Sequence, residues 1–225
     1  MSILSDKEIA LECEYYDTPS GFKSRVELTG RGIAFPTKKQ MIEPFIPYQV
    51  RSEVTGKDTT RKVISYGLSS YGYDVRLGKE FKIFRPTTVD GYGLYNVPVD
   101  PLNPVEGDYV DIEVTADGSI TIPPGGFLLG HTYEQIAEPD DVLIICLGKS
   151  TYARLGLVVN VTPLEPGWKG QVVIEISNTS TRPVKVYSGM GIAQFVFFRG
   201  NPCTTTYADR HGKYQGQQGV TVAKP

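Results

Sequence analysis

The stretch that decides the fold is GKSTYARLGLVVNVTPLEPGWKGQVVIEISN, residues 148–178. It consists of apolar, β-branched runs typical of buried strands, joined at a Pro-Gly turn. Charged and hydroxyl side chains interrupt these runs: Lys149, Ser150, Arg154, Glu165 and Glu175. Burying a charge is unfavourable unless it is paired or used, so these residues are candidates for a functional site. A structural ion pair between Glu175 and Arg154 explains the same pattern, and periodicity alone does not decide between the two interpretations.

The rest of the chain has the composition of a β protein. Its 225 residues include 24 Gly, 16 Pro, 14 Tyr and 9 Phe, which favours many short strands separated by turns. From residue 65 onward, turn formers separate short apolar runs such as 119–122, 142–148 and 192–199. This spacing predicts an all-β fold with short N-terminal helices: a sandwich, jelly roll or distorted barrel. Strands do not alternate with long helices, so a doubly wound parallel sheet is disfavoured.

The N-terminal region, residues 1–64, is expected to contain short helices and loops. Ser5, followed three residues later by Glu8, matches a capping box and predicts a short helix. The remainder lacks a clear strand period. We expect a loop at 16–36, a helical turn at 38–45 and a mobile polar loop at 51–62.

The whole chain is expected to form one domain, with a β domain at 65–206 and a flexible C-terminal lid at 207–225. The C-terminal segment is polar and has no core period, so a disordered terminus explains it. Its density of hydrogen-bond donors favours a segment that closes over phosphates. The donors are Lys213, Tyr214, Gln215, Gln217 and Gln218.

Charge and hydropathy exclude several classes of protein. The formal net charge of -2 gives no reason to expect binding to nucleic acid or to an anionic membrane. No apolar run approaches the length of a membrane span, and the N-terminus MSILSDKE lacks a signal-peptide core, so we expect a soluble, cytoplasmic protein. Cys13, Cys146 and Cys203 are odd in number and far apart, which does not indicate a disulfide framework.

Two common motifs are missing. With only two histidines and no H-x-E…P-C-x-x-C, H-E-x-x-H or C-x-x-C pattern, we expect no zinc site built on Cys and His. GKS at 148–150 is not a P-loop because residue 143 is Leu143 rather than glycine. Lys149, Ser150 and Arg154 are still a compact anion-binding group if 150–154 turns helically, since Ser150 and Arg154 then share one face.

Two carboxylates are the candidates for chemistry. Glu175 has apolar neighbours on both sides, which predicts a raised pKa and a general base near neutrality. Glu165 begins the EPGW turn and is suited to accept a hydrogen bond from a ligand hydroxyl. A solvated turn carboxylate next to a packing residue, Trp168, explains it equally well.

The same residues carry a family resemblance. The stretch 148–178 resembles the core of bacterial dCTP deaminases, within the dUTPase-like superfamily. The similarity continues through GMGIAQ (189–194), TTY (205–207) and GKYQGQQG (212–219), and upstream through MIEPF (41–45) and VISYGLSSYGYDVRLGKEFKIF (63–84). It covers most of the chain from about Met41 onward, with its motifs in order.

The resemblance implies a homotrimer of distorted jelly-roll (β-clip) subunits with active sites at subunit interfaces. It implies zinc-independent hydrolytic deamination of dCTP to dUTP and ammonia, in the synthesis of dUMP and dTTP precursors. Glu175 is then the general acid/base, and Ser150 and Arg154 position the water and the cytosine ring. Glu165 takes the place of the acidic residue at the deoxyribose, which is often Asp in the family. Mg²⁺ is implied only through the substrate triphosphate.

The implied substrate-binding set is larger. It comprises Lys149, Ser150, Thr151, Tyr152, Ala153, Arg154, Glu165, Val173, Ile174, Glu175, Gln194, Tyr207, Lys213 and Gln217. Backbone groups at 173–175 and the Gln194 side chain are expected at the base and sugar, and Lys149, Ser150 and residues of the C-terminal segment at the triphosphate. The family also makes dTTP a candidate feedback inhibitor. The segment 14–39 exceeds the usual N-terminal region and has no assigned role.

Other functions are compatible with parts of this pattern. A bifunctional enzyme that converts dCTP to dUMP shares the Ser150, Arg154 and Glu175 set. A plain dUTPase is disfavoured because the hairpin reads PLEPGW and the tail GKYQGQQG. A non-catalytic nucleotide sensor on the same fold has no need of Glu175 as a proton-transfer group.

Overall fold

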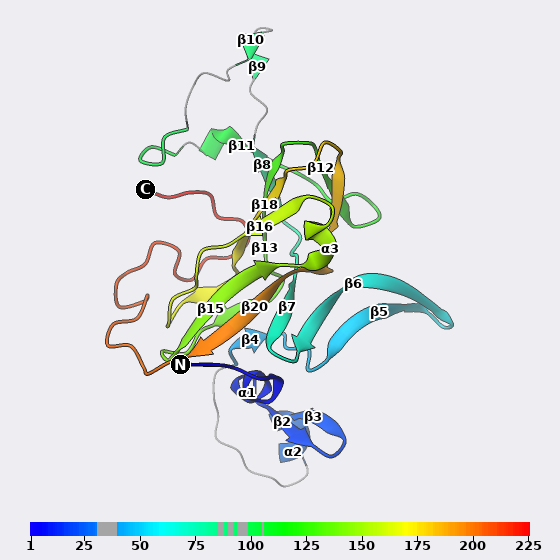
Figure 1. Ribbon diagram of the computed structural model, residues 1–225, viewed down its shortest axis with the longest axis vertical. Coiled ribbons are helices and arrows are strands. Elements are labelled where there is room, and N and C mark those ends of the chain that lie inside the picture. Colours follow the sequence, from blue (N-terminus) through cyan, green and yellow to red (C-terminus); the bar gives the residue numbers. More distant parts are fainter. Residues whose placement is uncertain (31–39, 85–87, 90–91, 94–98, 105) are drawn as a thin grey trace.

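The protein is described by a computed structural model that covers residues 1–30, 40–84, 88–89, 92–93, 99–104 and 106–225. Within these residues the fold is mostly β with a few short helices, which confirms the expected fold class. Figure 1 shows most of the strands gathered in one body, with helix α1 (Asp6–Glu12) between this body and the other N-terminal elements. No described helix has the length and apolar character needed to cross a membrane.

The main sheet is antiparallel and positions half of the candidate site. Its order is β1 (Ser2–Ile3), β20 (Gly191–Arg199), β7 (Gly72–Arg76), β6 (Thr59–Ser69) and β5 (Gln49–Gly56), and β15 (Val142–Gly148) also pairs with β20. Alternate residues of these strands, such as Val142, Ile144, Phe195 and Phe197, are fully buried. The other face of the sheet therefore carries the residues available for function.

A second antiparallel sheet carries Glu175. Its order is β11 (Tyr109–Asp111), β8 (Lys82–Phe84), β13 (Phe127–His131), β18 (Val173–Asn178) and β16 (Leu157–Asn160). In β18, Ile174 and Ile176 are fully buried in the core. Because side chains alternate along a strand, Val173 and Glu175 face the opposite side.

The remaining elements are small. They are the pair β12 (Ser119–Ile122) and β19 (Val184–Tyr187), the sheet of β17 (Lys169–Gly170), β14 (Gln135–Ala137) and β4 (Ile42–Glu43), the pair β2 (Tyr15–Thr18) and β3 (Gly21–Ser24), the pair β9 (Thr88–Val89) and β10 (Tyr92–Gly93), helices α2 (Arg25–Thr29) and α3 (Ser150–Ala153), and the 3₁₀ turn η1 (Glu106–Asp108). Leu4 and Ile9 lie in the same hydrophobic core as Phe197. The N-terminal elements and the β strands thus share one core, and β6 spans the boundary between residues 64 and 65.

The expected N-terminal helix is confirmed as α1. The backbone N–H of Ser5 donates to the Glu8 carboxylate at 2.8 Å, which is the reciprocal bond of a capping box. The expected strands at 119–122 and 142–148 are also confirmed, as β12 and β15. In each case the signal came from a face that is buried in the structure.

The expected loop at 16–36 is wrong for residues up to 29. The chain forms the hairpin β2–β3 and then α2, which has its own capping box between Ser24 and Glu27. This Ser-x-x-Glu signature was present, but α2 buries only Leu28 and so gives almost no apolar period. Residues 31–36 lie outside the described part.

The expected mobile loop at 51–62 is also wrong. These residues form most of the β5–β6 hairpin, which projects from the body in Figure 1. The far part of the hairpin is exposed on both faces, and an ion pair between Arg61 and Glu53 at 2.9 Å links its strands. Since neither face is buried there, the strands lack the alternation of apolar and polar residues that identifies a strand in a sequence.

The expected helical turn at 38–45 is contradicted for residues 40–45. Ile42 and Glu43 form β4, in which Ile42 is paired with Ile136 of β14. Pro44 disfavours the helical conformation of the residue before it, and Met41 and Ile42 are both fully buried. Residues 38 and 39 lie outside the described part.

A buried carboxyl group follows β14. Glu138 is 3% exposed, and neither of its carboxyl oxygens has a hydrogen-bond partner among the described residues. Burial raises its pKa from 4.5 to about 9. The folded chain therefore binds more protons than the unfolded chain between these two values, so Glu138 lowers the stability progressively as the pH rises through this window.

We expect Glu138→Leu to raise the free energy of unfolding by about 1–3 kcal/mol near pH 7, because it removes an unpartnered buried polar group. The gain should increase from pH 5 to pH 9. Thermal unfolding across this range measures it, with the exposed Glu113→Gln as the control. A gain that is the same at both ends of the range would show that ionisation of Glu138 is not its cause.

Candidate active site

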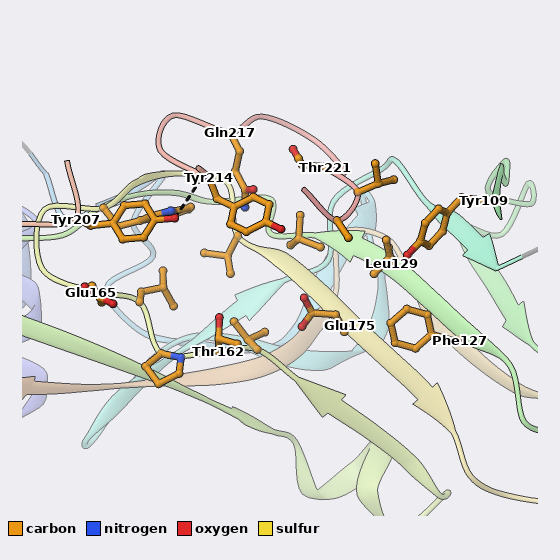
Figure 2. Close-up of a pocket in the computed structure, with 18 residues that line it drawn as sticks. Tyr109, Phe127, Leu129, Thr162, Glu165, Glu175, Tyr207, Tyr214, Gln217 and Thr221 are labelled. Atoms are coloured by element: carbon orange, nitrogen blue, oxygen red, sulfur yellow. Dashed lines mark hydrogen bonds between the residues drawn. The ribbon is translucent and has the colours of Figure 1, made fainter. Parts of the chain in front are cut away.

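A cavity of about 350 Å³ lies beside Glu175. Its apolar lining consists of Phe127, Leu129, Val161, Pro163, Leu164, Trp168, Val172, Val173, Val222 and Ala223. Its polar lining consists of Tyr109, Thr162, Glu165, Glu175, Tyr207, Tyr214, Gln217 and Thr221. Figure 2 shows Glu175 on one side of this space, with Tyr214 and Gln217 of the C-terminal segment on the other. An apolar cavity with a few polar groups is typical of a small-molecule site.

Glu175 has the electrostatics of a proton-transfer group. It lies mid-strand in β18, where its direct cross-strand neighbours are Leu129 and Asn160. Its Oε2 atom is buried and has no hydrogen-bond partner among the described residues. Burial raises its pKa from 4.5 to about 7, the direction expected from its apolar neighbours. The group is therefore able to take up and release a proton near neutral pH.

Glu175 is not held in a structural ion pair with Arg154. Arg154 is exposed at the end of α3, and neither residue makes an ion pair within the described part of the chain. The structural ion-pair interpretation of this stretch is therefore wrong for the isolated chain. The raised pKa of Glu175 agrees with this, because a nearby cation would lower it.

The EPGW turn forms one rim of the cavity. Glu165 is half-exposed there, and its closest cation is the Arg210 guanidinium at 3.7 Å. Trp168 is 5% exposed and forms part of the cavity wall, so its expected packing role is confirmed. Gly167 has a φ of +84°, the left-handed conformation expected for this turn.

The C-terminal segment lies against the cavity of its own chain instead of extending into solvent. The backbone N–H of Gln171 donates to the Gln217 carbonyl at 3.0 Å, and the N–H of Gly216 donates to the Lys169 carbonyl at 2.8 Å. Tyr207, Tyr214 and Gln217 line the cavity. A disordered terminus is therefore not what the structure contains.

Most amide donors of this segment are already in use. Gln215 donates to the Gly167 carbonyl at 3.0 Å, and Gln217 donates to the Gln171 carbonyl at 2.8 Å. Gln218 donates to the Gln135 side chain at 3.1 Å. These bonds attach the segment to the body, so in the isolated chain these amides hold the segment in place.

Other predicted residues lie elsewhere. Lys213 does not line the cavity, and its Nζ donates to the Lys224 carbonyl at 2.7 Å. Tyr152 is buried, and the Ile174 side chain is also in the core, so neither side chain is exposed to a ligand.

The GKSTYAR segment forms a second cluster. Residues 149–154 and Gln194 do not line the cavity. As expected, 150–154 turns helically, with the Arg154 N–H donating to the Ser150 carbonyl at 3.2 Å. Lys149 donates to Asp74 at 2.5 Å, and the Gln194 amide donates to Ser69 at 3.0 Å. Ser150, Thr151, Ala153 and Arg154 are exposed.

Sequence reasoning missed several of these residues. Asp74 is 2% exposed within the strand YGYDVRLG, and it meets the same criterion that identified Glu175, a carboxylate inside an apolar run. Tyr109 and Phe127 come from strands far from Glu175 in the sequence, and no local pattern marks them. Only the sheet topology brings them together.

The described part of the chain contains no metal-binding cluster and no disulfide. No group of three or more Cys, His, Asp or Glu residues there is arranged to hold a metal ion. Cys13 and Cys146 are buried, Cys203 is partly buried, and none of the three forms a disulfide with another described residue.

Comparison with known proteins connects this chain to a family. Residues 35–200 match the model of a family described as dCTP deaminase-like. The dCTP deaminase of Gluconobacter oxydans is 53% identical over 188 residues, which is 83% of this chain and 92% of the relative. The dCTP deaminase of Leptothrix cholodnii is 52% identical over 185 residues, or 82% and 90% of the two chains.

Solved structures resemble the chain more distantly. The 2'-deoxycytidine 5'-triphosphate deaminase from Agrobacterium tumefaciens aligns with a TM-score of 0.48 and 18% identity, covering 88% of this chain and 48% of that chain. The native EIAV dUTPase aligns with a TM-score of 0.35 and 23% identity over 38% of this chain and 72% of that chain. On the family model and the relatives above 50% identity, this chain belongs to the dCTP deaminase-like family.

Proposed function

We propose that this protein is a zinc-independent deaminase that hydrolyses dCTP to dUTP and ammonia. The observation that carries the proposal is Glu175, an unpaired carboxyl group beside an apolar cavity with a pKa raised to about 7. Two relatives named dCTP deaminase, at 53% and 52% identity, support the choice of substrate.

The proposed chemistry uses Glu175 twice. Its carboxylate takes a proton from a water molecule while the water oxygen bonds to C4 of the cytosine ring, and the carboxylic acid delivers this proton to ring N3, so that the N3=C4 double bond becomes N3–H. The carboxylate then takes the proton of the new C4 hydroxyl group and passes it to the exocyclic nitrogen. The C4–N bond breaks, ammonia leaves and the uracil carbonyl forms. A pKa of about 7 suits both steps, because neither protonation state is rare at neutral pH.

The proposed site is completed by a second copy of the chain. Ser150 and Arg154 are exposed and absent from the cavity lining, and the apolar side chains Leu147, Leu155 and Val158 near them are each about half exposed. Exposed apolar residues around a polar group are typical of an interface. We place Ser150 and Arg154 of one protomer over the Glu175 cavity of the next in a homotrimer, where they position the water and the ring.

The remaining proposed contacts are those that the family resemblance implies. Glu165 on the cavity rim accepts a hydrogen bond from the deoxyribose, and backbone groups of 173–175 and the Gln194 amide contact the base and sugar. Lys149, Tyr207, Lys213 and Gln217 hold the triphosphate. Mg²⁺ prefers oxygen ligands such as carboxylates and phosphates, whereas these triphosphate residues are cations, amides and a phenol. They suit an ion held by the substrate's phosphate oxygens, which neutralises part of the triphosphate charge.

Subunit complementation tests the shared site. Glu175→Gln and Arg154→Ala should each be nearly inactive alone. Co-expressed with two different tags and purified as mixed trimers, they should recover about a third of wild-type turnover, because one of the three interfaces in every mixed trimer has both residues intact.

The matched control is a mixed oligomer of Glu175→Gln with the double variant Glu175→Gln/Arg154→Ala, which contains no intact Glu175 and should stay inactive. If the Glu175→Gln and Arg154→Ala mixture also stays inactive while forming stable oligomers, Arg154 does not act on a neighbour's Glu175, and the shared site is wrong.

A further inference from the structure

A row of paired residues crosses the main sheet and ends near the GKSTYAR segment. Five strands contribute one directly paired residue each: Gln49, Gly67, Asp74, Gln194 and Leu147. Residues paired in this way project from the same face of a sheet. The row starts at the base of the projecting β5–β6 hairpin and ends two residues before Lys149.

The first and third residues of the row are joined directly across β6. The Gln49 amide donates to Asp74 Oδ2 at 3.0 Å. The same oxygen accepts from Lys149 Nζ at 2.5 Å. The buried Asp74 carboxylate thus fixes Gln49 on one side and Lys149 on the other.

The row continues from Gln49 to a second cation. Gln49 Oε1 accepts two hydrogen bonds from Arg51, from Nε at 3.2 Å and from Nη2 at 2.9 Å. An unbroken series of hydrogen bonds therefore connects Arg51 to Lys149 through Gln49 and Asp74. It places a guanidinium at one end and an ammonium at the other, and the exposed Ser150 directly follows Lys149 in the chain.

Of the two cations at the ends of this series of hydrogen bonds, only Lys149 is neutralised by a carboxylate among the described residues. Asp74 balances Lys149, whereas Arg51 is held by a neutral amide and has no carboxylate partner in the described part of the chain. Arg61 on the same hairpin differs, because Glu53 neutralises it. Arg51 uses two of its five N–H donors and Lys149 one of its three, so both keep donors for a ligand.

We propose that Arg51 is a further phosphate-binding residue of this protein, with Gln49 and Asp74 as the positioning residues that fix Arg51 and Lys149. The ligand is a polyphosphate, the terminal phosphates of a nucleoside triphosphate. Phosphate is matched by the planar fork of arginine, and two fixed cations suit a chain of several anionic groups. The proposed function is needed only to identify the nucleoside that carries these phosphates; the phosphate site itself does not depend on it.

Binding of inorganic tripolyphosphate to the full-length protein, measured by calorimetry, tests the anion site without any reaction. Arg51→Ala should raise the Kd about tenfold, since a hydrogen-bonded charge is lost. Arg61→Ala, on the same hairpin and already neutralised by Glu53, should leave the Kd within twofold. Arg51→Lys should lie between wild type and Arg51→Ala, because it restores the charge without the fork.

The positioning role of Gln49 is tested by a separate substitution. Gln49→Met keeps the side-chain length but removes the bonds to Arg51, so it should raise both the tripolyphosphate Kd and the KM for dCTP, with kcat within twofold. In the Arg51→Ala background the same substitution should have a much smaller effect. A purely structural role would lower the unfolding temperature equally in both backgrounds and would not produce this dependence.

The outcomes separate this inference from the proposed function. If Arg51→Ala binds tripolyphosphate as tightly as wild type, or wild type does not bind it, the inference is overturned, whatever the deaminase activity. If wild type binds tripolyphosphate through Arg51 but leaves dCTP unchanged, the inference stands and the proposed function fails.

Discussion

Glu175→Gln is expected to reduce dCTP turnover by about 10²–10⁴-fold, the usual contribution of a general acid/base. The amide keeps the shape of the carboxyl group, so the affinity for dCTP should change only a few-fold. Steady-state kcat and calorimetric binding of dCTP measure the two effects separately. The change removes the one carboxyl group beside the cavity whose pKa is raised to about 7.

The pH dependence of dCTP turnover tests the same role of Glu175. Glu175 must be ionised to accept the proton of water, so wild-type turnover should rise as the pH increases through about 7. The residual turnover of Glu175→Gln should lack this rise. The exposed Glu113→Gln should behave as wild type. Near-normal turnover of Glu175→Gln would show that another group is the base.

Deletion of residues 207–225 is expected to weaken dCTP binding by about tenfold to a hundredfold, or roughly 1.4–2.8 kcal/mol. The deletion removes Tyr207, Tyr214 and Gln217 from the cavity lining and opens the cavity to water. Calorimetry with dCTP on the full-length and shortened proteins measures the loss, after circular dichroism has shown that both are folded.

A point variant separates closure of the segment from loss of its side chains. Gln215 does not line the cavity, and its amide attaches the segment to Gly167. Gln215→Ala should therefore weaken dCTP binding by less than the deletion. An unchanged affinity of the shortened protein would contradict the role of the segment as a lid.

The predictable part of the fold is the part with one buried face. Strands 119–122 and 142–148 were identified because their buried and exposed residues alternate or their apolar run is continuous. The β5–β6 hairpin was missed because its outer part is exposed on both faces, and ladder hydrogen bonds have no sequence period. α2 was missed because a single buried residue, Leu28, gives no helical period.

Only some residues of the candidate site could be predicted from the sequence. Glu175 was identified from its apolar neighbours, and its raised pKa agrees with this. Asp74 satisfies the same criterion and was overlooked, although it holds Lys149. Sequence alone did not separate the residues beside Glu175 from those beside Lys149, because the sheet topology distributes the motifs over two faces.

The most direct test of the central claim is the product of dCTP. We predict that the purified protein, incubated with dCTP and Mg²⁺ at neutral pH, accumulates dUTP and ammonia in equal amounts, as quantified by chromatography and an ammonia assay. Release of dUMP and pyrophosphate would show a bifunctional enzyme instead. Unchanged dCTP, from protein that binds the nucleotide, would contradict the deaminase assignment and leave a nucleotide sensor on this fold.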